Sequence, residues 1–77
     1  MKLRDAISKR VFNLLSERKI TQYELCKRGG VPRSTLNDVV NTNKKRISTD
    51  TVLQICSTLE ISLKDFFDDP LFDNIDD

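Results

Sequence analysis

The sequence predicts an all-α fold, a compact arrangement of five helices with a short C-terminal helical turn. Apolar residues recur at the spacing of three and four that marks one face of a helix, and no segment alternates as a half-buried strand would. Ser, Thr and Asp stand before several of these stripes, where their oxygens can cap a first helical turn. Only two Gly and two Pro occur in 77 residues, which also favours helices.

The first helix is predicted over about residues 3–18. Its apolar stripe consists of Leu3, Ile7, Val11, Leu14 and Leu15. Phe12 lies off this stripe, so it either covers the edge of the core or meets the C-terminal tail or a second subunit.

A second helix is predicted from Gln22 to about Arg28. Thr21 can accept a bond from an unpaired amide of its first turn, and Glu24 completes a capping box. The two glycines at 29–30 should end this helix, because glycine tolerates the positive φ of a tight reversal.

A third helix is predicted over about residues 32–41, with Pro32 at its first position, where a missing amide costs nothing. Leu36 and Val39 share its inward face. The opposite arc carries short polar side chains and one arginine: Arg33, Ser34, Asn37, Asp38 and Asn41, with Thr35 and Val40 at its margins. A merely solvated helix would carry more Lys and Glu. Two helices joined by a glycine turn, the second with such a face, indicate a helix-turn-helix that reads the major groove of DNA.

The remaining helices follow a basic connector over residues 42–46. Ser48 or Thr49 should cap a fourth helix, whose apolar face holds Val52, Ile55, Cys56 and Leu59. Ser62 with Asp65 predicts a fifth, short helix that brings Leu63, Phe66 and Phe67 to the core. Asp69 and Pro70 predict a final helical turn, with an apolar side formed by Leu71, Phe72 and Ile75.

Charge divides the chain. Residues 1–46 hold twelve Lys or Arg against four acids, a balance of +8, while residues 47–77 hold one base against eight acids, a balance of −7. The basic half contains the helix-turn-helix, and a local excess of cations is expected where a protein binds phosphates.

Composition disfavours catalysis. The chain has no His, so no Cys-His or Ser-His pair can form, and Cys26 and Cys56 alone cannot make a zinc site. We expect both thiols to be buried and free, although a redox role is left open. No enzyme activity, cofactor, metal or small-molecule ligand is expected. No apolar run is long enough for a membrane span and no secretion signal is evident, so a cytoplasmic location is expected.

Three landmarks connect the sequence to a known family: TQYELC, GGVPRSTLNDVV and STDTVLQICSTLEISLKDFF. With them, residues 4–67 resemble the lambda-repressor-like, Cro-type helix-turn-helix regulators of phage and bacteria. The resemblance implies one DNA-binding domain over residues 1–77, with its helix-turn-helix at 21–41 and an acidic tail at 68–77.

The resemblance also implies roles for individual residues. Gln22 would touch a phosphate and brace the third helix. Residues at the exposed start of that helix would lie at the bases: Arg33, Ser34 and Thr35, followed by Asn37 and Asp38. The loop after it would meet the DNA backbone through Asn43, Lys44, Lys45 and Arg46. The chain departs from the family at Cys26, where Ala is usual, at Pro32, where Ser or Thr is common, and at Asp38, often a base.

Chemistry supports several of these roles. Arg33 can bond O6 and N7 of guanine together, although a phosphate contact or a surface ion pair would suit it too. Asn37 could bond adenine in the same two-point way. Ser34 and Thr35 could donate to a phosphate or a base. Asp38 could accept from cytosine, orient Arg33 or Gln22, or simply be solvated. Basic residues of the 42–46 loop would add affinity that does not depend on sequence.

These features predict a sequence-specific regulator that binds double-stranded DNA and acts as a repressor. A homodimer through the C-terminal aromatic and aliphatic surface would let it read a palindrome. Two other functions stay open: the antitoxin of a toxin pair, and a helical adaptor that binds only proteins.

Overall fold

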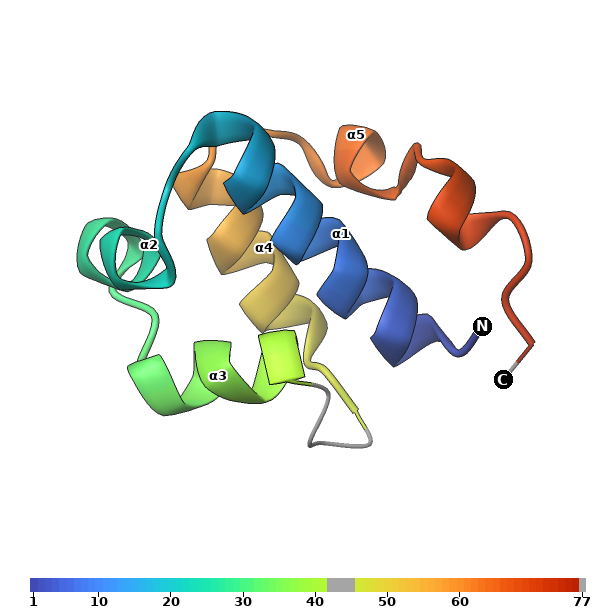
Figure 1. The fold of residues 1–77 in the computed structure, drawn as a ribbon, viewed down its shortest axis with the longest axis horizontal. Coiled ribbons are helices and arrows are strands. Elements are labelled where there is room, and N and C mark those ends of the chain that lie inside the picture. Colours follow the sequence, from blue (N-terminus) through green and yellow to red (C-terminus); the bar gives the residue numbers. More distant parts are fainter. Residues whose placement is uncertain (42–45, 77) are drawn as a thin grey trace.

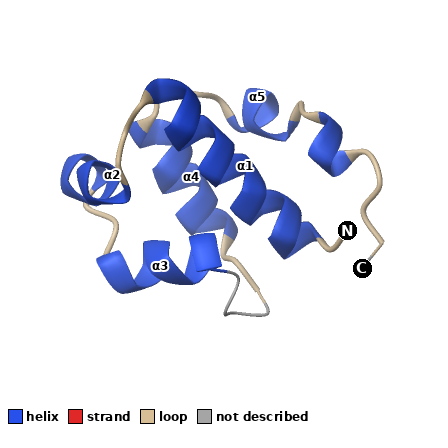
Figure 2. Ribbon diagram, in the orientation of Figure 1, coloured by secondary structure: helices blue, strands red, loops and turns tan. Residues whose placement is uncertain are grey.

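The computed structural model describes residues 1–41 and 46–76, and helices account for the regular structure in them. The elements are α1 (Leu3–Arg18), α2 (Gln22–Gly29), α3 (Arg33–Asn41), α4 (Thr49–Thr58), α5 (Leu63–Phe67) and a 3₁₀ turn, Pro70–Phe72. The predicted all-α fold of five helices and a C-terminal turn is confirmed (Figures 1 and 2). None of the described helices combines the length and apolar character that crossing a bilayer requires.

Side-chain caps start α2, α4, α5 and the 3₁₀ turn where the sequence predicts them, whereas α1 begins without one. Thr21 accepts a bond from the Glu24 amide and forms the complete capping box. Ser48, rather than Thr49, caps α4. The other two caps are Ser62, which accepts from the Asp65 amide, and Asp69, which accepts from the Leu71 amide.

The helices surround one apolar core. α1 packs against α3 and the 3₁₀ turn, α4 packs against α2 and α5, and α2 packs against α3. The core draws on every helix and on the turn between α2 and α3: Ile7, Val11, Leu14, Leu15, Leu25, Val31, Leu36, Val39, Val52, Ile55, Cys56, Leu59 and Phe66. In Figure 1, α2 and α3 lie at one end and both termini at the other.

Some residues expected in the core lie outside it. Leu63 is 40% exposed and Phe67 38% exposed, because α5 has only five residues and turns one large side chain, Phe66, fully inward. Leu3 begins α1 and is also exposed. Cys26 is only half-buried, whereas Cys56 is buried as expected.

The two glycines are needed for different reasons. Gly30 has φ +68°, the left-handed conformation that the predicted reversal requires, and a Cβ added there would meet no atom within 4 Å. Gly29 has no such φ, but a Cβ there would lie 2.1 Å from the Thr58 hydroxyl oxygen. The missing side chain of Gly29 therefore lets the end of α2 approach α4.

The start of α3 differs from the prediction by one residue. The helix begins at Arg33, and the Pro32 carbonyl accepts from the Leu36 amide at 3.1 Å. Pro32 thus precedes the first helical residue. The shift does not alter which residues of α3 face inward.

Candidate DNA-binding surface

The inner face of α3 packs against α1 and α2. Leu36 and Val39 are buried, and Val31 fills the space beneath the turn. At the far end of the helix, the Ser8 hydroxyl of α1 donates to the Val40 carbonyl at 2.9 Å. Because both ends of α3 are fixed in this way, its polar arc is presented on the outside.

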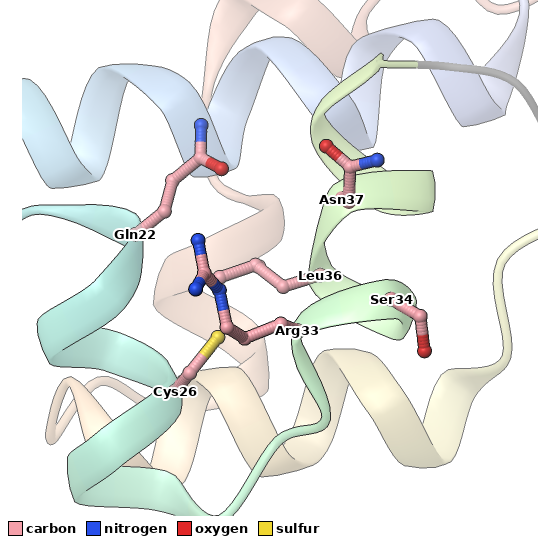
Figure 3. Close-up of a pocket in the computed structure, with 6 residues that line it drawn as sticks. All are labelled: Gln22, Cys26, Arg33, Ser34, Leu36 and Asn37. Carbon is pink, nitrogen blue, oxygen red and sulfur yellow. The ribbon is translucent and has the colours of Figure 1, made fainter.

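Helices α2 and α3 share a hollow on that outer side (Figure 3). Four of the predicted site residues line it together with two less polar ones: Gln22, Arg33, Ser34 and Asn37, with Cys26 and Leu36. In Figure 3 the Arg33 side chain extends toward α2, whereas Ser34 points away from it. The structure therefore brings Gln22 of α2 into one surface with the start of α3.

Tyr23 is a neighbour of this hollow that the sequence analysis did not select. Tyr23 is 58% exposed, and the centroid of its ring lies 5.9 Å from the guanidinium carbon of Arg33. A cation at this distance from an aromatic face is attracted by the ring quadrupole. The signal in the sequence is an aromatic residue beside Gln22 at the exposed start of α2, but the pairing with Arg33 depends on how the two helices cross.

Three of the other predicted residues lie beside a second hollow. Thr35, Asp38 and Arg46 line it, and so does Ser48 at the start of α4. Its lining is completed by Val39, Ile47 and Thr51. Asp38 thus lines the same hollow as Arg46 and is not among the residues that line the Arg33 hollow. This placement gives no support to Asp38 as the residue that orients Arg33 or Gln22.

Asn37 forms a bond within α3. Its side-chain oxygen accepts from the Asn41 amide nitrogen at 2.5 Å. An amide oxygen has two lone pairs, and the Asn37 NH₂ group has two donors, so a two-point contact with adenine stays chemically open. Asn41 was not among the predicted site residues, and its role here is to hold the Asn37 amide plane.

The basic connector is described only at its last residue. Arg46 is exposed, as a phosphate contact would require. The predicted contacts of Asn43, Lys44 and Lys45 lie outside the described residues.

Comparison with known proteins agrees with this geometry. Residues 10–70 match the family described as the Cro/C1-type HTH DNA-binding domain. The chain is also similar to a solved structure, the crystal structure of the prophage Lp1 protein 11, with 29% identity and a TM-score of 0.84. That similarity covers 97% of this chain and 100% of the other. No curated protein matches the sequence. The chain belongs to the Cro/C1-type helix-turn-helix DNA-binding family.

Proposed function

We propose that the protein is a sequence-specific transcriptional repressor that occupies operator DNA with α3 in the major groove. The observation that carries the proposal is the hollow shared by α2 and α3, where Gln22, Arg33, Ser34 and Asn37 form one polar surface. Polar groups gathered at the exposed start of a second helix suit base edges, and Gln22 beside them suits a phosphate.

The second hollow supports a separate contribution to binding. Arg46 and Thr35 line a different hollow from Arg33, and Asp38 lines that hollow too. A guanidinium there would neutralise a backbone phosphate and release counterions. Asp38 would weaken phosphate binding nearby. We therefore propose that Arg33 and Asn37 select sequence, whereas Arg46 and the preceding basic residues contribute general affinity.

We further propose that two copies bind a palindromic site. Phe12 is 54% exposed on α1 and lines a hollow with Met1 and Val40. Met1 also lines the next hollow, beside Leu71. Phe72 packs against the core, so a dimer surface would use Leu71 and Ile75 of the predicted tail. The support for this assignment is that Phe12, Met1 and Leu71 border two hollows that share Met1, although polar residues such as Lys9 and Asn13 also line them.

The test selects duplexes from a random pool with the purified protein and measures their binding across a salt series. We expect a palindromic selected sequence, bound by two copies in sedimentation. Arg33→Ala should reduce the preference for the selected sequence by about 1–3 kcal/mol, because one two-point base contact is lost.

Arg46→Ala provides the matched control. It should weaken binding to selected and scrambled duplexes alike and lower the salt slope by about 1. Equal binding to every duplex, or a preference unchanged by Arg33→Ala, would contradict base reading by α3. A single copy on the selected site would contradict the dimer.

A further inference from the structure

The Arg33 guanidinium lies over the Tyr23 ring, and no carboxylate pairs with it in the part of the chain that the structure describes. The Arg33 guanidinium carbon lies 5.9 Å from the Tyr23 centroid. Glu24, the acidic residue of α2, accepts at 3.3 Å from the Thr21 hydroxyl and pairs with Arg28 at 3.6 Å. Its carboxylate is therefore engaged elsewhere.

Whether the partner of Arg33 is a ring or a carboxylate decides whether the N–H donors of the guanidinium stay available. A carboxylate would accept two N–H bonds from arginine and neutralise its charge. An aromatic face attracts the cation but leaves its N–H groups and its charge available to another acceptor. In Figure 3 the Arg33 side chain lies between α2 and α3, on the side where Gln22 stands.

We propose that Tyr23 is a positioning residue that restrains Arg33 for base reading without using its donors. This inference rests on the proposed DNA-binding function. A restrained guanidinium loses less side-chain freedom when it binds, so the ring should strengthen the selected contact specifically. Tyr23 itself is uncharged and should leave non-specific binding unchanged.

One measurement needs no DNA. In the free protein, the Arg33 Nε–Hε resonance should show a ring-current shift from Tyr23. Tyr23→Leu removes the ring and keeps an apolar side chain, so the shift should vanish; Tyr23→Phe should retain it. Because Tyr23 is exposed, thermal unfolding should be similar in all three proteins. An Arg33 Nε–Hε resonance unaffected by Tyr23→Leu would contradict the contact between the Tyr23 ring and Arg33.

A double-mutant cycle then tests the consequence on the selected duplex. Tyr23→Leu should weaken binding about two- to fivefold, the fold-change that an exposed cation–π contact of about 0.5–1 kcal/mol corresponds to. In an Arg33→Ala background the same substitution should have no effect. Tyr23→Phe should bind the selected duplex nearly as tightly as the wild type. Scrambled duplex should bind Tyr23→Leu, Tyr23→Phe and the wild type with equal affinity.

The possible failures are distinct. Effects of Tyr23→Leu and Arg33→Ala that simply add would overturn the positioning role. Tighter binding by Tyr23→Leu would also overturn it, because the ring would then withhold Arg33 from DNA. If the wild-type protein binds no duplex, the proposed function fails, while the resonance shift still decides whether the ring holds Arg33.

Discussion

At the scale of single residues, Cys56 shows how the core controls the chemistry of a side chain. It is fully buried in α4, and burial raises the pKa of its thiol above the ordinary value of 9.0, although the positive charge of Arg10 partly opposes this. The folded protein therefore keeps the thiol proton at a pH where the unfolded chain releases it. Burial thus disfavours the thiolate, which is the reactive form of Cys56.

The expected consequence is a loss of stability in alkali. Because the folded pKa is raised, the contribution of Cys56 is complete below the unfolded pKa and falls as pH rises above about 9.0 toward the folded value. Urea unfolding at several pH values should show this decline in the wild type. Cys56→Ala should show a shallower decline, and Cys26→Ala, at a half-buried position, should follow the wild type. Identical pH dependence in all three would contradict the argument.

At the scale of elements, the approach of α2 to α4 depends on Gly29. A Cβ at this position would meet the Thr58 hydroxyl at 2.1 Å and the Thr58 Cβ at 3.1 Å. Gly29→Ala should therefore lower the free energy of unfolding by about 1–3 kcal/mol, the usual cost of overpacking. Thr58→Ala should recover part of that loss, since it removes the nearest atom.

Gly30→Ala is the matched control. It should cost about 1–2 kcal/mol through the left-handed backbone, with nothing for Thr58→Ala to relieve. Chemical denaturation of the single and double variants measures both cases. If the effects of Gly29→Ala and Thr58→Ala simply add, the steric explanation fails.

These elements show which parts of the fold follow from local sequence. Helix bounds and caps were predictable because Thr21 and Ser62 bond amides three residues away. The need for glycine at position 29 could not be predicted, because it depends on Thr58, a residue of another helix. Phe67 was misplaced for a related reason, since the stripe of a five-residue helix does not show how many side chains can turn inward.

The candidate site was predictable to the same extent. A helical wheel gives the direction of each α3 side chain, so the polar arc could be predicted. It does not show which element lies beside each margin. The sequence therefore could not predict that Thr35 and Asp38 line a different hollow from Arg33. It also could not predict the contact of the Tyr23 ring with Arg33. Both depend on how the helices cross in space.

At the scale of the whole molecule, Arg10 joins the first helix to the end of the chain. Its guanidinium donates to the Phe66 carbonyl at 2.8 Å, the Asp65 carbonyl at 3.0 Å and the Asp69 carboxylate at 3.1 Å. The Arg10 side chain is only 12% exposed. Its bonds to Phe66 and Asp69 are partly buried, whereas its bond to the Asp65 carbonyl lies at the surface. One cation of the basic half thereby fixes the acidic C-terminal segment.

Arg10→Ala should lower the free energy of unfolding by about 2–3 kcal/mol, because charged hydrogen bonds are lost and their acceptors are left partly buried. Arg10→Lys should recover little of this stability, because the compact ammonium group lacks the planar, widely spaced donors with which the guanidinium reaches three acceptors. Urea denaturation and amide exchange over residues 63–76 measure the effect. Arg28→Ala, which breaks the exposed pair with Glu24, should change stability by less than about 0.5 kcal/mol. An Arg10→Ala protein as stable as Arg28→Ala would contradict the tethering role.

Under the proposed function, the hollow between α2 and α3 has a consequence for exchanging sequence preference between relatives. Its lining is drawn from both helices, with Gln22 and Cys26 on one and Arg33 and Asn37 on the other. A graft of α3 alone would place the side chains of the donor protein beside an α2 helix from a different protein. The proposal therefore makes residues 22–41 the transferable unit, and a chimaera should be cut outside both helices.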